Sequence, residues 1–335
     1  MANITETIKT VFPATKVAII GDIVADQYLN GTISRVSREA PVFILRHDQT
    51  TTLPGAAANA AANVASLGAR ACIVGVIGAD ANGKLLLERM TEIGVDVASV
   101  VKDDAASTAT KVRILAGQQH AARQQVIRVD YENEAPYAAQ TRQKVIDNAV
   151  AAVRSADAVI FSDYNYGAAD TEIFEAVRAA AAERGISLLV DSRFRLQDFR
   201  GASSATPNQD EVEQILGPGF GDADCDRLRD ELGLESLLVT NGNKGMTLIE
   251  RGRQPQHIDA VGSDQAVDVT GAGDTVIAAY ALGLASGLSY FDAAKLANHA
   301  GGIVVMKKGT AAVAPEELIA SINSIAADDI LSSNA

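Results

Sequence analysis

The feature that most constrains the fold is a regular alternation of apolar strands and helices in the second half of the chain. Helical patterns over residues 141–154 and 171–184 alternate with short apolar runs at 158–163 and 187–191. Short runs with few polar residues are typical of strands buried on both faces, which occur in parallel sheets covered by helices. The sequence therefore predicts an α/β fold with a Rossmann-like central parallel sheet flanked by helices.

The composition agrees with that architecture. Apolar residues make up 47% of the 335-residue chain, aromatic residues make up only 4%, and tryptophan is absent. Such a core must be built from Ala, Val, Ile and Leu, which suits helices packed on a buried sheet. We expect residues 1–330 to form a single domain and residues 331–335 to form a frayed tail.

Two other segments carry an alternating pattern with charges, which is expected for strands exposed on one face. They lie at about 26–46 and 107–131, and residues 117–120 are suited to a hairpin connection within the second. We expect the two segments to pair in a small β-sheet that forms a lid or a dimerisation surface. The alternative for their arginine and lysine side chains is solvated charge that protects edge strands from aggregation.

A glycine-rich stretch with the sequence DVTGAGDT occupies residues 268–275, directly before an apolar segment with a helical pattern. A Gly-x-Gly turn that opens a helix presents backbone N–H groups at the positive end of the helix dipole, which makes an anion site. The carboxylate of Asp274 follows at once. A carboxylate beside an anion site suits deprotonation of an alcohol that attacks a phosphoryl group. The alternative is an aspartate that only caps the helix.

Further polar residues stand where apolar runs end. Asp22 follows the run 16–21, and Asp163, Asp191 and Thr240 close later runs. Ligands of open parallel sheets bind outside the carboxyl ends of the strands. We therefore expect these residues to line one edge of the sheet.

The net charge of −13 argues against a nucleic-acid partner, because neutralising a phosphate backbone requires a basic face. The first 15 residues are polar and mixed in charge, unlike a signal peptide. No uninterrupted apolar run approaches the roughly 20 residues of a membrane span. We expect a cytoplasmic protein with no membrane partner.

Together these motifs resemble the ribokinase-like sugar kinase family, over residues 16–315. The DVTGAGDT block resembles one family signature, and the segment from Gly55 to Asn59, with Gly68, resembles the other. Residues 208–211, with the sequence NQDE, match the NxxE motif of the family. The resemblance implies a ribokinase-like fold and transfer of the γ-phosphate of ATP to a sugar hydroxyl with Mg²⁺. We also expect a homodimer formed through the lid.

The resemblance assigns a role to each candidate residue. The catalytic residues are the base Asp274 and the anion-hole amides of Gly271, Ala272 and Gly273. The residues expected to bind the sugar, or a phosphate on it, are Asp22, Arg35, Gly55, Asn59, Lys111, Arg113, Arg128 and Asp163. The residues expected to bind ATP are Asn208, Glu211, Thr240, Gly242, Gly245, Asn298 and Thr310. Asn208 and Glu211 are expected to place Mg²⁺ through water, or else to be an ordinary helix start. A monovalent cation near Asp268 is left open.

Within the family, residues 34–42, with the sequence SRVSREAPV, resemble the SRISPEAPV block of the heptose 7-phosphate kinase subgroup. Segments 110–113, 125–130 and 305–310 also resemble that subgroup. This implies phosphorylation of heptose 7-phosphate to heptose 1,7-bisphosphate, a step towards a lipopolysaccharide precursor. The chain stops without the nucleotidyltransferase half that follows in the two-part relatives, so only the kinase step is expected.

The chain departs from these patterns near the expected substrate pocket. Ala56 stands where the family usually has a second glycine, and Arg38, Tyr166 and Arg193 lie in segments that differ from the subgroup. The departures keep another sugar or sugar phosphate, such as fructose or ribose, as the first alternative. A sugar-sensing pseudokinase that binds ligand without turnover is the alternative of a different class.

Overall fold

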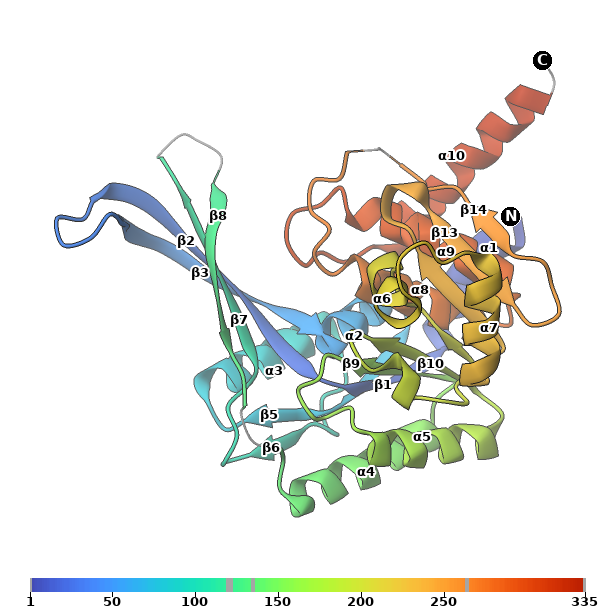
Figure 1. The fold of residues 1–335 in the computed structure, drawn as a ribbon, viewed down its shortest axis with the longest axis horizontal. Coiled ribbons are helices and arrows are strands. Elements are labelled where there is room, and N and C mark those ends of the chain that lie inside the picture. Colours follow the sequence, from blue (N-terminus) through green and yellow to red (C-terminus); the bar gives the residue numbers. More distant parts are fainter. Residues whose placement is uncertain (1, 119–122, 134–135, 263–264, 334–335) are drawn as a thin grey trace.

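The computed structural model describes residues 2–118, 123–133, 136–262 and 265–333 (Figure 1). Among these residues the largest sheet has eight strands, in the order β14-β13-β12-β11-β10-β9-β1-β4. The strands are β1 (Lys16–Gly21), β4 (Arg70–Val74), β9 (Ala158–Asp163), β10 (Ser187–Ser192), β11 (Ser204–Ala205), β12 (Ser236–Thr240), β13 (Met246–Glu250) and β14 (Gln256–Ile258). Neighbours from β4 to β12 are parallel, whereas β13 and β14 form an antiparallel edge. The predicted parallel sheet is confirmed.

The sheet is covered by helices on both faces. In β1, Val17 and Ile19 belong to one hydrophobic core, while Ala18 and Ile20 belong to the core on the opposite face, because successive side chains of a strand alternate. The first core includes side chains of α1 (Ala2–Thr10), α2 (Ala57–Ser66), α3 (Ala81–Ile93), α8 (Ala272–Ala285), α9 (Tyr290–Val304) and α10 (Pro315–Ser333). The second includes side chains of α4 (Ala139–Arg154), α5 (Thr171–Arg184), α6 (Gln209–Leu216) and α7 (Asp222–Leu232). None of the described helices is both long and apolar enough to cross a membrane.

A second sheet projects from this layered core, and we refer to it as the lid (Figure 1). Its strand order is β3-β2-β7-β8. The strands are β2 (Ile23–Val36), β3 (Phe43–Ala56), β7 (Thr110–Gly117) and β8 (Gln124–Tyr131). β2 pairs with β3 in antiparallel and with β7 in parallel, so the two segments predicted to be exposed do pair with each other. Part of the predicted hairpin connection, residues 119–120, lies outside the described residues.

The apolar run 70–77 does not form one continuous strand. It divides into β4 and β5 (Val76–Gly78), and β5 pairs with β6 (Val101–Asp103) in a separate two-stranded sheet. The division falls at Gly75, where an added Cβ would lie 2.4 Å from the carbonyl oxygen of Gly21. The close approach of two backbones at this point therefore turns the chain out of the central sheet.

The C-terminal helix is longer than predicted. α10 continues to Ser333, so residues 331–333, which were expected in a frayed tail, lie in the helix. Alanine and leucine are strong helix formers, which favours a helix through this segment. Residues 334–335 lie outside the described residues. Three short 3₁₀ turns complete the elements: η1 (Phe12–Ala14), η2 (Leu196–Asp198) and η3 (Gly242–Lys244).

Ala56, at the turn from β3 into α2, has a strained backbone. Its φ of 54° and ψ of −131° lie in a region that residues with a side chain rarely adopt. Holding alanine there costs on the order of 1–3 kcal/mol. This explains in physical terms why glycine is the usual residue at the position. β3 runs to Ala56, and α2 begins at the next residue, Ala57.

Candidate active site

A cavity of about 480 Å³ lies between the lid and the carboxyl edge of the central sheet. We call it the lid cavity. Its charged and polar lining includes Asp26, Lys111, Arg113, Arg128, Tyr164, Tyr166, Arg193, Thr270, Asp274 and Thr310. Four cationic side chains therefore share this space with four carboxylates, those of Asp26, Asp130, Glu132 and Asp274.

Two more cavities meet the same helix end. The sheet-edge cavity, of about 480 Å³, is lined by Asp191, Arg193, Thr206, Asn208, Glu211, Thr240, Ala272 and Gly273, among others. The apolar cavity, of about 200 Å³, is lined by residues that include Thr240, Gly242, Gly245, Val261, Asn298 and Val305, again with Ala272 and Gly273. The N-terminus of α8 thus stands where three cavities converge, with Gly271 and Asp274 on the side of the lid cavity.

Asp274 is held on both carboxylate oxygens. The side-chain amide of Asn59 donates to Oδ2 at 2.8 Å, and the hydroxyl of Tyr164 donates to Oδ1 at 2.8 Å. Burial, followed by the nearby carboxylate of Asp191, raises the pKa of Asp274 to about 7, and the two donors lower it in part. A carboxylate with a pKa near neutrality is matched to proton abstraction at physiological pH.

Gly271 can be replaced by no other residue without a shift of neighbouring atoms. Its φ is 77°, and an added Cβ would lie 2.4 Å from the side-chain nitrogen of Asn59. Its carbonyl oxygen accepts from the backbone N–H of Thr275, in the first turn of α8. Of the three amides expected in the anion hole, that of Ala272 donates to the carbonyl oxygen of Val269 at 3.2 Å, so it is engaged in the turn.

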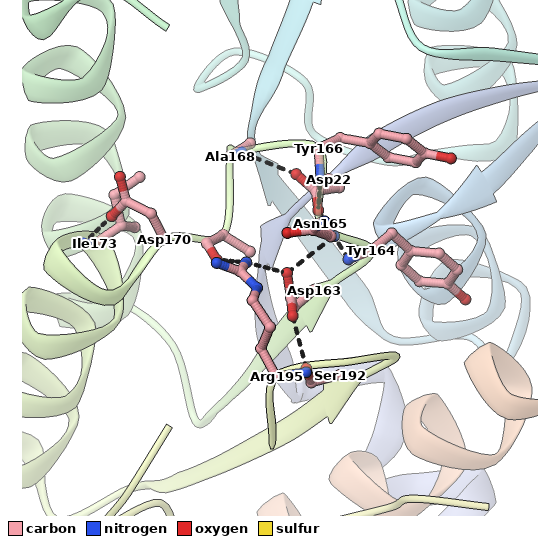
Figure 2. Close-up of polar contacts among 11 residues, drawn as sticks. Asp22, Asp163, Tyr164, Asn165, Tyr166, Ala168, Asp170, Ile173, Ser192 and Arg195 are labelled. Carbon is pink, nitrogen blue, oxygen red and sulfur yellow. Dashed lines mark hydrogen bonds and ion pairs between the residues drawn. The ribbon is translucent and has the colours of Figure 1, made fainter. Parts of the chain in front are cut away.

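Two aspartates expected at the sugar are instead buried beneath the loop that follows β9 (Figure 2). Asp22 accepts from the backbone N–H groups of Tyr164 at 2.8 Å, Tyr166 at 3.0 Å and Ala168 at 2.8 Å. Burial is the main cause that raises the pKa of Asp22 to about 6. The structure gives Asp22 the role of a loop anchor and does not place it on the wall of the lid cavity.

Asp163 is the second anchor of this loop. It accepts from the backbone N–H of Asn165 at 3.0 Å, from the hydroxyl of Ser192 at 2.6 Å and from the guanidinium of Arg195 (Figure 2). Its side chain is fully buried. Asp163 is not among the residues that line the lid cavity, and its carboxylate is held by donors of the protein.

Four other candidate residues do not line the cavity expected for them. Arg35 is exposed near the far end of β2 and does not line the lid cavity, because β2 carries it away from the core. Gly55 is buried against Asp26, whose Oδ2 would lie 2.7 Å from an added Cβ. Asn59 contacts Asp274 rather than the cavity. Thr310 lines the lid cavity instead of the apolar cavity expected to hold adenine.

The remaining lid residues are brought together as the sequence suggested. Lys111, Arg113 and Arg128 all line the lid cavity. The Nη1 of Arg113 lies 2.6 Å from Oδ1 of Asp26. The Nζ of Lys111 lies 5.5 and 5.4 Å from the ring centroids of Tyr164 and Tyr166, within the range of a cation–π contact.

Asn208 and Glu211 form a reciprocal capping box at the start of α6. The side chain of Asn208 accepts from the Glu211 backbone at 2.9 Å, and Glu211 Oε2 accepts from the Asn208 backbone at 2.9 Å. The other oxygen of Glu211 lies 3.5 Å from Nη1 of Arg193. Both residues line the sheet-edge cavity with Asp191, whose pKa is raised to about 7 by burial and then by the Glu211 charge.

These oxygens suit Mg²⁺, which is usually held by one or two carboxylates while its other ligands are water and substrate phosphates. In the described part of the chain, no group of three or more His, Cys, Asp and Glu side chains is gathered for a metal ion.

Tyr164 was not among the candidates, Arg193 was named only as a departure from the subgroup, and Asp191 was expected only to line the edge of the sheet. Asp191 lies in β10, and Tyr164 directly follows the last residue of β9. Arg193 lines both the lid cavity and the sheet-edge cavity. The rule that ligands bind at the carboxyl ends of parallel strands points to all three positions. It does not say which of the side chains there face the cavity.

Comparison with known proteins gives a family and close relatives. The model of the pfkB family carbohydrate kinases matches residues 14–317. A bifunctional protein HldE from Chromohalobacter salexigens is 40% identical over 319 residues, covering 94% of this chain and 65% of the relative. Another, from Azorhizobium caulinodans, is 38% identical over 317 residues, covering 93% and 65%. The chain thus spans 65% of the length of these two relatives.

Solved structures agree on the fold. The ribokinase of Arabidopsis thaliana, complexed with ribose and ATP, has a TM-score of 0.70 at 22% identity and covers 92% of this chain and 98% of its own. A mutant phosphofructokinase-2 from Escherichia coli has a TM-score of 0.76 at 15% identity, covering 93% and 99%. With the family match across most of the chain, the protein belongs to the pfkB family of carbohydrate kinases.

Proposed function

We propose that the protein transfers the γ-phosphate of ATP to the anomeric hydroxyl of a heptose 7-phosphate, giving heptose 1,7-bisphosphate. The observation that carries the proposal is the position of Asp274 at the helix end where the lid cavity, lined by Lys111 and Arg128 among others, meets the two cavities at the sheet edge. The resemblance of segments 34–42, 110–113 and 125–130 to heptose 7-phosphate kinases supports the choice of sugar.

Asp274 would act as the base. An acceptor hydroxyl in the lid cavity would give its proton to the carboxylate as its oxygen attacks the γ-phosphorus. The N-terminus of α8, with the amides of Gly271 and Gly273, would stabilise the negative charge of the phosphoryl group in transfer. Arg193, which lines both the lid and the sheet-edge cavities, would neutralise part of the same charge.

The nucleotide would occupy the other two cavities. The apolar cavity, with Thr240, Gly242, Gly245 and Asn298 in its lining, suits adenine and ribose, and the sheet-edge cavity suits the phosphates. Asn208 and Glu211, beside Asp191, would hold Mg²⁺ partly through water. When bound, Mg²⁺ neutralises charge on the β- and γ-phosphates.

The phosphate already on the acceptor would be bound by Lys111 and Arg128. Charge-assisted hydrogen bonds contribute roughly 1.5–3 kcal/mol each, so Lys111→Met and Arg128→Met should each raise KM for heptose 7-phosphate by about 10- to 100-fold. The KM for unphosphorylated heptose should change little. Steady-state kinetics with both sugars measures this.

Arg46→Met is the matched control for these variants. Arg46 is also a cation of the lid, but its side chain is 70% exposed and does not line the lid cavity. It should leave both KM values near those of the wild type. If Lys111→Met and Arg128→Met affected the two sugars equally, the phosphate-binding role would be wrong.

A panel of acceptors tests the proposed function as a whole. ADP formation should be measured with heptose 7-phosphate, heptose, fructose, fructose 6-phosphate and ribose, and we expect the highest kcat/KM with heptose 7-phosphate. A higher kcat/KM with another sugar would show that the acceptor is that sugar, and the assignment as a kinase would stand. Tight ATP binding with no turnover on any sugar would instead support a sensing protein.

We further propose a homodimer formed through the lid. The lid exposes large apolar side chains that a monomer would leave in water, among them Val36, Val42 and Phe43 near its end and Val126, Ile127, Val129 and Tyr131 on β8. Exposed apolar patches of this kind mark interaction surfaces. Contact between the lids of two copies would cover them.

The dimer predicts a clear change on sedimentation. In sedimentation equilibrium the wild type should have twice the 34.9 kDa mass of one chain. The variant Ile127→Glu/Val129→Glu should have the mass of one chain. Val11→Glu, which changes an exposed apolar residue outside the lid, should remain dimeric. A wild type that is monomeric at micromolar concentration would contradict the proposal.

A further inference from the structure

Tyr164 connects the loop after β9 to the carboxylate of Asp274. Its backbone N–H donates to the buried anchor Asp22, which fixes the start of the loop, and its hydroxyl donates to Oδ1 of Asp274 at 2.8 Å. Figure 2 shows the Tyr164 side chain pointing away from the two aspartate anchors. The loop therefore presents this one hydroxyl at a defined place.

The ring of Tyr164 is fixed by cations from two different elements. The Nζ of Lys111, on β7, lies 5.5 Å from the ring centroid, and the Cζ of Arg193, after β10, lies 5.0 Å from it. Arg193 Nη2 also lies 3.5 Å from the hydroxyl oxygen. A side chain held at the backbone, on the ring and at the hydroxyl has little freedom to leave Asp274.

We infer that Tyr164 is a positioning residue for the base, which fixes one carboxylate oxygen of Asp274 in its ionised form while Asn59 fixes the other. The inference rests on the proposed function, in which Asp274 takes the proton of the acceptor hydroxyl. Each carboxylate oxygen has a second lone pair, so both hydrogen bonds can persist while Asp274 accepts a proton. The hydroxyl thereby sets both the orientation and the basicity of the carboxylate.

The hydrogen bond from Tyr164 matters because the charges around Asp274 act in opposite directions on its ionisation. Asp191, at the end of β10, disfavours the charge on Asp274, whereas Arg193, Asn59 from α2 and Tyr164 favour it. Burial and the neighbouring Asp274 charge raise the pKa of Tyr164 above its usual value, so the hydroxyl keeps its proton and acts as a donor. Without that donor, Asp274 would be protonated over a wider range of pH.

The test compares Tyr164→Phe with Tyr166→Phe. Both tyrosines line the lid cavity and contact Lys111, but the hydroxyl of Tyr166 donates to Glu132 at 3.0 Å instead of to Asp274. Carbon-13 NMR of protein labelled at the aspartate carboxyl carbons, titrated from pH 4 to 9, follows Asp274 directly. The difference from an Asp274→Asn sample identifies its resonance.

In Tyr164→Phe the pH at which the Asp274 carboxyl is half protonated should rise by roughly one to two units. A shift of this size corresponds to the loss of one hydrogen bond to a charged group. In Tyr166→Phe this midpoint should stay at the wild-type value. Incorporating 3,5-difluorotyrosine at position 164 keeps the ring and strengthens the donor, so the midpoint should fall. Equal midpoints in the wild type, Tyr164→Phe and the fluorinated protein would overturn the inference.

Kinetics separates this inference from the proposed function. The pH profile of kcat/KM for heptose 7-phosphate falls on its acid side as Asp274 is protonated. In Tyr164→Phe this acid limb should shift to higher pH by the same amount as the NMR midpoint. If Asp274→Asn retained turnover, the base assignment would fall. If Asp274→Asn abolished turnover while Tyr164→Phe left the acid limb in place, only the role of Tyr164 would be overturned.

Discussion

Replacement of Asp274 by asparagine is expected to lower kcat by a factor of about 10² to 10⁴, the usual contribution of a positioned general base. Asparagine has nearly the same shape but cannot take the proton of the acceptor hydroxyl. The Kd for ATP should change little, because Asp274 lines the lid cavity and not the two cavities at the sheet edge. Single-turnover rates and ATP titration measure the two effects separately.

The same substitution should not destabilise the protein. The pKa of Asp274 is raised from 3.8 to about 7, so the folded state binds this proton more tightly than the unfolded state. Ionising Asp274 therefore lowers the free energy of unfolding as pH rises from about 4 to about 7. Asp274→Asn removes that penalty, and at pH 8 it should unfold at the same temperature as the wild type or at a higher one.

Asp292→Asn is the matched control for Asp274→Asn. Asp292 is also a carboxylate in the first turn of a helix, and it accepts a hydrogen bond from Ser289 at the start of α9. It should leave kcat at the wild-type value. Wild-type turnover in Asp274→Asn, or an equal loss in both variants, would show that Asp274 is not the base.

The second large effect concerns the ion pair between Arg113 and Asp26 at the base of the lid. The side chains are only 12% and 6% exposed, and the two charged atoms lie 2.6 Å apart. Arg113→Met should lower the free energy of unfolding by about 3–5 kcal/mol, because it leaves a buried carboxylate without its cation. Urea denaturation at pH 8 measures the loss.

Two further measurements distinguish the effect of the unpaired Asp26 charge from the effect of lost side-chain packing. Burial raises the pKa of Asp26, and Arg113 opposes the shift. In Arg113→Met the Asp26 carboxyl should therefore take up a proton more readily. The loss in free energy of unfolding should then shrink as the pH is lowered towards 5. The double variant Asp26→Leu/Arg113→Met removes both charges and should recover most of the stability. A loss below about 1 kcal/mol in Arg113→Met would show that the pair contributes little.

Much of the fold could be predicted from the sequence because its signals are local. The helix predicted at 171–184 is found at Thr171–Arg184, where Asp170 caps one end and Gly185 adopts a left-handed conformation at the other. Hydrophobic runs identified the buried strands for the same reason. The division of the run 70–77 was missed because it depends on contact between Gly75 and Gly21, which are far apart in the chain.

The site could be predicted only in part. The strand-end rule identified Asp22 and Asp163 as residues at the correct edge of the sheet, but the backbone N–H groups of the loop after β9 needed acceptors, and these carboxylates supply them. Arg35 and Thr310 were misplaced because the reach of the lid and the path of the chain after α9 are tertiary properties. Tyr164 gave no signal of its own, since its role depends on Asp274, 110 residues later.

The most direct test of the central claim is product analysis by phosphorus-31 NMR after the protein is incubated with ATP, Mg²⁺ and heptose 7-phosphate. The account predicts a new sugar phosphate resonance that is coupled to the anomeric proton and equal in amount to the ADP formed. It also predicts no such resonance with Asp274→Asn. ADP formed without this resonance, or an equal yield from the wild type and Asp274→Asn, would contradict the account.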